Sequence, residues 1–326
     1  MICGTPPFAS AQDGLLSLSR QMRARGTTLR DCAGRRVQWS VAHVYGIQFD
    51  IEWEDKGENH RRVVKVLEEI RPAEGSLVVL PELFDVGFSL NTEVLCEEVT
   101  EGASEAWCSA TAKRFGVFLQ GASIRMDGSC DRDGDGGAGK ATNNAVVFDP
   151  AGNLVCRYAK VFPFSGGDEP RKYRGGDSVA TFDWRGIRVC PLICYDLRFP
   201  ELWRLAAIDF GVEMFTCGAS WPAVRQAHWS TLLRARAIEN QAYVVGINRC
   251  GNDINLSYIG GSKIVEPRGE VVDEAGDGFR VVVADIDGEA VQAWRAEFCA
   301  LRDVRREMLG RVAGNEWLFS ARGKRS

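Results

Sequence analysis

The chain has 326 residues, of which 45% are hydrophobic and 26% are charged, and it carries a net charge of −4 with a pI of about 5.6. This balance is typical of a globular protein with one large or two modest domains, and the acidic charge argues against a nucleic-acid partner. No apolar run reaches the ~18–20 residues that span a bilayer, and the N-terminus lacks the basic and apolar regions of a secretory signal. We therefore expect a cytoplasmic protein with no membrane partner.

The first residues of the chain differ in composition from the rest. Residues 1–38 are rich in Arg, Gly, Ser and Thr and show no strand pattern, so we predict an N-terminal extension there. We expect the main domain to cover residues 39–312 and a C-terminal tail to cover residues 313–326. No repeat of 20–50 residues is present.

From Ser40 onward, strand-like and helix-like segments alternate. Apolar runs predict single strands at 40–50, 76–82, 117–126, 212–218, 242–250 and 279–287. Turn signals at Asp-Pro-Ala-Gly-Asn, Trp-Arg-Gly and Glu-Pro-Arg-Gly predict hairpins at 144–160, 178–194 and 262–274. Helical stripes, closed by signals such as Pro72 and Gly116, predict helices at 59–72, 104–116, 200–211 and 221–241.

This order of elements predicts an α/β protein with mixed β-sheets. Helices come about once for every two strands, which is too few to cover both faces of every sheet. Two sheets stacked face to face, with helices only on the outer faces, satisfy that ratio. The expected fold is therefore a four-layer αββα sandwich.

Eleven cysteines and three histidines bound the available chemistry. An odd number of cysteines without regular spacing, in a chain of this length, indicates reduced thiols. The chain has no C-x-x-C pair, and His43, His60 and His228 lie far from any pair of neighbouring cysteines. We therefore expect neither a dithiol redox motif nor a structural zinc site.

Cys194 lies where the apolar strand RVCPLIC gives way to Tyr-Asp-Leu-Arg, and Pro200 marks the start of a helix. Side chains at such a strand end face a crevice at the carboxyl edge of the sheet, and a nearby helix N-terminus favours a thiolate. Cys190, inside the strand, is expected in the core. Spacing alone fits a catalytic Cys194 and an inert buried thiol equally well.

A catalytic thiol needs a base, and no histidine is placed to serve as one. His60 lies beside arginines on an amphipathic helix and is expected to be solvated. His43 alternates within the first strand, which favours a core or interface position. His228 follows Trp221 in a helix and could line a pocket. A carboxylate is the better candidate for the base.

Three charged residues occupy strand ends or lie close to one. Glu82 directly follows the buried run LVVLP, where a carboxylate suits a general base. Lys160 ends another strand, where an ammonium group can stabilise an oxyanion. Glu169, nine residues further on, could hold either of them in place. Each charge alone is compatible with simple solvation, but their shared position favours a common site.

The stretches LPELFDVGF, YAKVFPF and ICYDLRFPELWR, in this order, resemble the signatures of the nitrilase superfamily of carbon–nitrogen hydrolases. The resemblance implies a four-layer sandwich, a homodimer that extends it, and no cofactor or metal. It implies that Cys194 is the nucleophile, Glu82 the general base and Lys160 the oxyanion stabiliser. Glu169 matches a second glutamate of many members, and the backbone N–H of Tyr195 would be the second oxyanion donor.

The stretches CYDLRFPELWR, SWPAVRQAHW and DEPRKY are most similar to the ω-amidase branch, whose substrates are ω-amides of α-keto acids such as α-ketoglutaramate. Such a dicarboxylate-type substrate needs a cation, and Arg198 and Arg171 are available. A structural ion pair of Arg198 with Asp196 or Glu201 is the alternative. The substrate-site residues we expect are Tyr195, Arg198, Trp221 and Tyr173.

One departure from the family pattern, and three other functions, are also considered. Members often carry His two residues after the lysine, where this chain has Phe162. A carbamoyl-amine hydrolase would use the same chemistry, and a binding protein without activity could keep the same fold. A redox sensor would need a Cys190–Cys194 bridge, but these strand positions lie ~13 Å apart, beyond disulfide reach.

Overall fold

The structure, a computed structural model, describes residues 42–97, 102–126 and 139–310, together with the backbones of three further strands. Two of these strands, β1 (Leu29–Arg30) and β2 (Arg36–Val37), form an antiparallel pair. The other residues of the predicted extension lie outside the described residues.

The chain divides into two compact units, Met1–Val41 and Ala42–Ser326. The second unit contains two large sheets, and both combine parallel with antiparallel strands. Among the described residues, no helix has the length and apolarity needed to cross a membrane.

The first sheet has six strands in the order β16-β3-β4-β5-β6-β7. Strands β3, β4 and β5 are parallel, and β6 and β7 reverse direction in turn, so that β7 runs the same way as β4. The residues that follow β4 and β7 therefore reach the same edge of the sheet. The bounds are β3 (Ala42–Gln48), β4 (Leu77–Val79), β5 (Phe118–Arg125), β6 (Thr142–Phe148), β7 (Leu154–Ala159) and β16 (Arg280–Ile286).

The second sheet has seven strands in the order β15-β14-β11-β10-β9-β8-β17, with β9, β10 and β11 parallel. Strand β17 (Ala313–Trp317) pairs with β8, so the segment expected as a tail supplies an edge strand. Residues 318–326 lie outside the described residues. The other bounds are β8 (Ser178–Trp184), β9 (Ile187–Ile193), β10 (Met214–Ala219), β11 (Tyr243–Asn248), β14 (Lys263–Val265) and β15 (Val271–Glu274).

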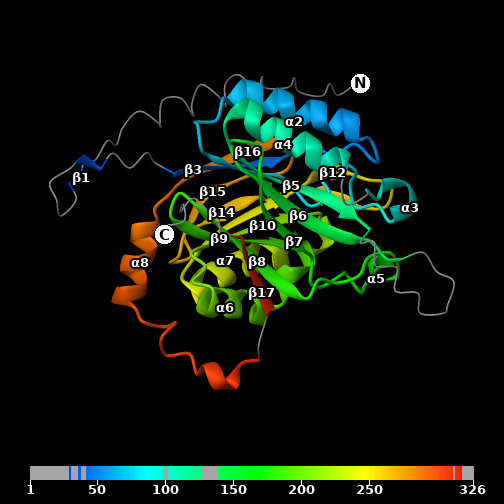
Figure 1. The fold of residues 1–326 in the computed structure, drawn as a ribbon. Coiled ribbons are helices and arrows are strands. Elements are labelled where there is room, and N and C mark those ends of the chain that lie inside the picture. Colours follow the sequence, from blue (N-terminus) through cyan, green and yellow to red (C-terminus); the bar gives the residue numbers. More distant parts are fainter. Residues whose placement is uncertain are drawn as a thin grey trace, which may run out of the picture. The chain divides into compact units, whose positions relative to one another are not determined.

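Helices cover the outer faces of the two sheets (Figure 1). Val63 and Leu67 of α2 (Lys56–Ile70) and Ala112 of α4 (Ala103–Phe115) pack with residues of β4 and β5 in one core. Helices α6 (Pro200–Asp209) and α7 (Gln226–Asn240) lie on the other sheet, and their apolar residues join the large core that includes the inner faces. The predicted four-layer αββα sandwich is confirmed.

Most helix boundaries follow the sequence signals. Helix α4 ends at Gly116, whose positive φ of 64° belongs to the left-handed region that glycine adopts at low cost, and α6 begins with Pro200. The helix predicted from Trp221 begins later, because the 3₁₀ turn η2 (Ala223–Arg225) precedes α7. The remaining elements are α3 (Thr92–Leu95), α5 (Glu169–Lys172), α8 (Gly288–Glu297), η1 (Cys194–Arg198), η3 (Arg306–Met308) and the hairpin β12 (Cys250–Asn252) and β13 (Ser257–Ile259).

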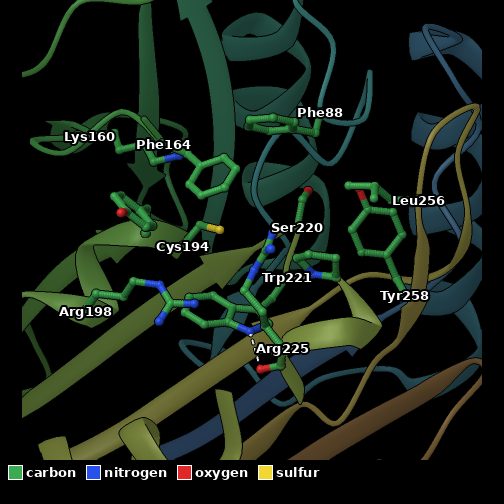
Figure 2. Close-up of a pocket in the computed structure, with 12 residues that line it drawn as sticks. Phe88, Lys160, Phe164, Cys194, Arg198, Ser220, Trp221, Arg225, Leu256 and Tyr258 are labelled. Carbon is green, nitrogen blue, oxygen red and sulfur yellow. Dashed lines mark hydrogen bonds between the residues drawn. The ribbon is translucent and has the colours of Figure 1, made fainter. Parts of the chain in front are cut away.

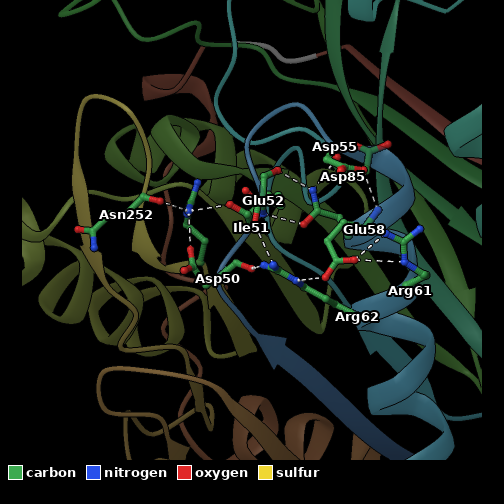
Figure 3. A network of polar contacts seen from close by, with 11 residues as sticks. Asp50, Ile51, Glu52, Asp55, Glu58, Arg61, Arg62, Asp85 and Asn252 are labelled. Carbon is green, nitrogen blue, oxygen red and sulfur yellow. Dashed lines mark hydrogen bonds and ion pairs between the residues drawn. The ribbon is translucent and has the colours of Figure 1, made fainter.

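A polar network fixes the start of α2 and the loop after β4. Asp55 caps the helix by accepting from the backbone N–H of Glu58, and Figure 3 shows Glu58 in turn between Arg61 and Arg62. One turn into the helix, Asn59 donates to the carbonyl oxygen of Asp85 at 2.8 Å. Because Asp85 lies three residues after Glu82, this bond anchors the loop that carries the expected general base.

Candidate active site

A small pocket, partly open to solvent, lies above Cys194. Figure 2 shows the sulfur of Cys194 pointing into it, with Lys160 and Phe164 on one side and Tyr258 and Leu256 on the other. The remaining lining residues are Phe88, Tyr195, Arg198, Ser220, Trp221, Pro222 and Arg225. Four of the predicted catalytic or substrate residues therefore line one pocket with Cys194: Lys160, Tyr195, Arg198 and Trp221.

Cys194 occupies the sharp turn between β9 and η1. Its φ is +45°, in the left-handed region that costs a residue with a Cβ about 1–2 kcal/mol. The surrounding sheet and 3₁₀ turn hold this conformation, which is the kind of local strain found at functional sites. Because the turn is so tight, the side chain leaves the strand direction and reaches the pocket, while Cys190 stays fully buried in the core as predicted.

The environment of Cys194 favours the neutral thiol. Burial raises the pKa of the Cys194 thiol well above its ordinary value, the charge of Glu82 and a hydrogen bond with it add to the shift, and Lys160 opposes it. Desolvation therefore outweighs the favourable effect expected from the nearby helix N-terminus, and the resting state favoured here is the thiol. A base must take the proton when the sulfur reacts.

Lys160 lies between two buried carboxylates. Its Nζ is 2.8 Å from Glu82 Oε1 and 2.9 Å from Glu169 Oε1, and all three side chains are at most 2% exposed. Burial alone would lower the pKa of Lys160, but the two carboxylates outweigh it, and the pKa lies well above its ordinary value. Lys160 is thus a permanent cation beside Cys194, and Glu169, the first residue of α5, holds it in place.

Both carboxylate oxygens of Glu82 have partners. Oε1 accepts from Lys160 and from Asn143 Nδ2 at 2.9 Å, and Oε2 accepts from the backbone N–H of Ser220 at 3.0 Å. Strand β10 can approach this closely because Gly218 has no side chain, since a Cβ there would lie 2.8 Å from the carbonyl oxygen of Leu80. Sequence reasoning missed Asn143, which reads only as one of two asparagines in a strand.

A second buried carboxylate joins the turn of Cys194 to the segment after Lys160. Asp196 accepts from the Tyr158 hydroxyl at 2.7 Å and from the backbone N–H groups of Ile193 and Phe162, both at 3.0 Å. Burial raises the pKa of Asp196 to about 7, although these three donors oppose the shift. Asp196 therefore fixes the spacing between the strand ends that carry Cys194 and Lys160.

Two arginines line the pocket without an ion pair to any residue in the described ranges. The guanidinium carbon of Arg198 lies 4.5 Å above the Trp221 ring, and that of Arg225 lies 5.2 Å from the Phe164 ring centre. Arg198 also contacts His228 Nδ1 at 3.2 Å. Burial lowers the pKa of Arg198, and the nearby Arg225 adds to that shift. The pocket wall therefore carries two positive charges with no fixed counter-charge.

A family model described as carbon-nitrogen hydrolase matches residues 44–296 of the chain. The chain belongs to the carbon–nitrogen hydrolase family. The nitrilase-superfamily resemblance predicted from three short stretches is confirmed, and so is the prediction of an enzyme of this hydrolase class.

This hydrolase is similar to known proteins over nearly their whole length. It is 33% identical over 260 residues to "Omega-amidase YafV" of Escherichia coli K12, covering 79% of this chain and 94% of that one. It is 30% identical to "2-oxoglutaramate amidase" of Bacillus subtilis 168, covering 83% and 100%. Among solved structures, XC1258 from Xanthomonas campestris, a CN-hydrolase superfamily protein with an arsenic adduct in its active site, superposes with a TM-score of 0.74 at 30% identity, covering 83% and 100%.

Several residues singled out in the sequence of this hydrolase lie away from the pocket lining. Tyr173 is buried behind the site and donates its hydroxyl to the carbonyl oxygen of Ser89 at 2.9 Å. Arg171 is exposed and pairs with Asp168. The expected solvation of His60 is wrong, because its ring stacks on Trp107 with centroids 4.2 Å apart.

Phe162, at the position where the family resemblance suggests His, lies outside the pocket lining. The Phe162 ring stacks on Phe199 at a centroid distance of 3.7 Å, and Phe162 is not among the residues that line the pocket. Its link to the site is through the backbone, whose N–H donates to Asp196. The side chain at position 162 is therefore not part of the pocket wall.

Proposed function

We propose that this protein hydrolyses the terminal amide of a small, linear, carboxylate-bearing substrate through a thioester on Cys194. The observation that carries the proposal is the buried Lys160 held between Glu82 and Glu169, with Lys160 and Cys194 lining the same pocket. A carboxylate–ammonium cluster with a thiol beside its cation, largely shielded from water, is suited to acyl transfer.

Acylation begins with proton transfer from Cys194 to Glu82. The raised pKa of Cys194 means that the resting thiol keeps its proton, so removal and attack are coupled. The charge of Glu82 acts on the Cys194 thiol, which makes Glu82 the carboxylate that takes the proton. The sulfur attacks the amide carbon, the carbonyl oxygen becomes an oxyanion, and Glu82 returns the proton to the departing ammonia.

Lys160 and the backbone N–H of Tyr195 stabilise the oxyanion. Lys160 cannot become neutral easily, because its two carboxylate partners raise its pKa. A fixed cation that needs no reorganisation during the reaction stabilises developing negative charge most effectively. Tyr195 follows the nucleophile directly in η1, so its N–H lies next to the reacting sulfur along the chain.

Deacylation uses the same carboxylate. Three of the hydrogen bonds to Glu82, from Lys160, Asn143 and Ser220, do not involve the thiol and persist when the sulfur is acylated. The place taken by the thiol proton then becomes free for a water molecule. Glu82 removes a proton from that water, and the resulting hydroxide attacks the thioester carbon. The C–S bond breaks, the acid is released, and Glu82 returns the proton to the Cys194 sulfur.

The pocket wall supports a substrate with a carboxylate. Arg198 and Arg225 have no carboxylate partner in the described chain, and a guanidinium group binds a carboxylate through paired hydrogen bonds. The substrates named for the relatives, ω-amides and 2-oxoglutaramate, carry such a group. We therefore propose an ω-amidase whose substrates are monoamides of dicarboxylates, such as α-ketoglutaramate, and which acts as a homodimer.

The test is ammonia release from α-ketoglutaramate and from a panel of short neutral amides. Wild type should prefer the acidic amide, Cys194→Ala should lose turnover, and the matched control Cys190→Ala should keep it. Mass spectrometry of the acidified reaction should detect an acyl group on the peptide containing Cys194. Equal turnover by wild type and Cys194→Ala would contradict the proposal, and release of CO₂ with ammonia from N-carbamoyl compounds would favour a carbamoyl-amine hydrolase.

A further inference from the structure

Asn143 of β6 joins the two charges on which the proposed chemistry depends. Its side-chain Nδ2 donates to Glu82 Oε1 at 2.9 Å, and its backbone carbonyl accepts from the backbone N–H of Lys160 at 2.9 Å. The residue is 2% exposed. Asn143 therefore fixes both the backbone position of Lys160 and the orientation of the Glu82 carboxylate.

The strand pattern decides which of the two neighbouring asparagines reaches the site. Ala145 and Val147 of β6 belong to the core between the two sheets, so Asn143, two residues earlier, faces the same way. Asn144 faces the opposite side, and its amide donates only to Ser123 and Thr142. The pair offers a matched comparison, because both side chains are buried amides in one strand.

A small cavity lies between the two sheets beside Asn143. Residues of β5, β6, β9 and β10 line it together with Glu82. Asn143 Oδ1 is buried, and within the described ranges no group donates a hydrogen bond to it. A buried carbonyl oxygen without a donor costs about 1–3 kcal/mol, and a bound water is the usual way to satisfy it.

We propose that Asn143 is the positioning residue of the general base, and that a water bound in the cavity between the sheets donates to its amide oxygen. The inference rests on the proposed function, because it gives Glu82 the role of base. An ionised carboxylate only accepts hydrogen bonds, so the amide must turn its NH₂ group toward Glu82. The flipped amide would set its oxygen against the Glu82 carboxylate, two acceptors facing each other. In the working orientation Oδ1 points away from Glu82, and a bound water can donate to it.

The donor from Asn143 acts on the same oxygen of Glu82 that contacts Lys160. A hydrogen bond to the charged form of an acid extends ionisation to lower pH. This effect acts in a crowded electrostatic setting, so removal of the amide must be compared with an equally disruptive change elsewhere. The charged and titratable groups that face Glu82 are Lys160, Glu169, Cys194, Cys217 and Tyr173.

The first experiment compares Asn143→Leu and Asn143→Ala with Asn144→Leu and Asn144→Ala. Leu has the same branched arrangement of side-chain heavy atoms as Asn but is bulkier, donates no hydrogen bond and excludes water. Ala leaves room for a water to donate to Glu82. We expect Asn143→Leu to lower kcat by about 10- to 100-fold with little change in KM, and Asn143→Ala to lose less. The acid limb of the kcat/KM profile should move up by about one pH unit in Asn143→Leu and stay unchanged in the Asn144 variants.

The second readout does not need turnover. The rate at which iodoacetamide alkylates Cys194, followed by peptide mass spectrometry as a function of pH, should show the same displaced limb in Asn143→Leu. A displaced alkylation limb in a protein that hydrolyses no amide would refute the proposed function and leave the role of Asn143 standing. If the Asn143 and Asn144 variants lose the same thermal stability and share one unshifted limb, Asn143 is only structural and the inference is wrong.

Discussion

The buried cluster around Lys160 and the wall of the pocket differ in how their charges are paired. In the cluster, Glu82, Lys160 and Glu169 are almost fully buried, and each contacts an opposite charge at 2.8–2.9 Å. On the wall, Arg198 and Arg225 are half-buried and contact aromatic rings without a carboxylate. The cluster is complete without a substrate, whereas the wall is electrostatically incomplete without an anion. This difference separates the groups suited to the reaction from the groups suited to recognition.

The largest expected effect comes from breaking the cluster at its cation. Lys160→Met keeps much of the side-chain volume but leaves two buried carboxylates without their counter-charge. We expect a loss of kcat of at least about 1000-fold, because the oxyanion loses its fixed cation. The free energy of unfolding should also fall by about 3–5 kcal/mol near neutral pH, measured by urea denaturation.

The control for this prediction is a Lys on the surface, Lys113→Met in α4. It should change neither kcat nor the urea midpoint appreciably, since substitutions away from buried networks usually have small effects. A Lys160→Met enzyme that folds with unchanged stability would show that the two carboxylates are not ionised together, and the contrast between cluster and wall would then be wrong.

Asp196 differs from Glu82 and Glu169, because all of the hydrogen bonds that it accepts come from neutral donors. Burial raises the pKa of Asp196 from 3.8 to about 7 in the folded protein. The folded state thus holds a proton that the unfolded state releases, so this group's stabilising contribution is complete below pH 3.8 and is lost as pH rises through 7.

We expect the unfolding free energy of wild type, relative to that of Asp196→Asn, to fall by about 2–3 kcal/mol between pH 5 and pH 8. Urea titrations of both proteins at each pH measure this difference, and other titrating groups cancel in the comparison. Asp183→Asn, on the exposed hairpin turn of β8 and β9, is the control and should give a flat difference. A flat difference for Asp196→Asn would mean that its three donors keep it ionised.

The sequence predicted the cluster better than the wall, for a physical reason. Glu82 and Lys160 follow apolar strands, and parallel strands bring such ends to one edge, so the strand pattern suggested a shared position and the family resemblance supplied the expected roles. Arg225 lies in a segment that reads as ordinary helix, and only the 3₁₀ turn before α7 turns it toward the pocket. Tyr173 was assigned to the substrate site although it packs behind it, since a sequence pattern does not give the depth of a side chain.

Asn143 shows a limit of a different kind. The strand reads Asn-Asn-Ala-Val-Val, and alternation requires one asparagine to face the inner core and the other to face the helices. The sequence does not say which, because both faces of this strand are buried. The structure decides it, because Ala145 and Val147 belong to the core between the sheets and Asn143 shares their face.

The wall is tested by removing its charges one at a time. Arg225→Met and Arg198→Met keep an apolar side chain against the neighbouring ring but lose the guanidinium group. We expect each to raise KM for α-ketoglutaramate by about 10- to 30-fold with a small change in kcat, the loss of one charge-assisted contact. A neutral short amide is the control substrate, and its KM should not change. An equal rise in KM for both substrates would mean that the arginines have a structural role and do not bind the carboxylate.

The smallest effect is expected at Phe162, where relatives often carry His. The Phe162 ring lies against Phe199 rather than in the pocket lining, and only its backbone N–H supports the site through Asp196. Phe162→His preserves that backbone bond and most of the ring stacking, so kcat/KM should change by less than about 3-fold, a cost below 1 kcal/mol. Phe162→Ala, which removes the stacking, should instead lower thermal stability. A gain of 10-fold or more in kcat/KM for Phe162→His would mean that this side chain turns toward the substrate during the reaction. Position 162 would then count among the residues that line the pocket.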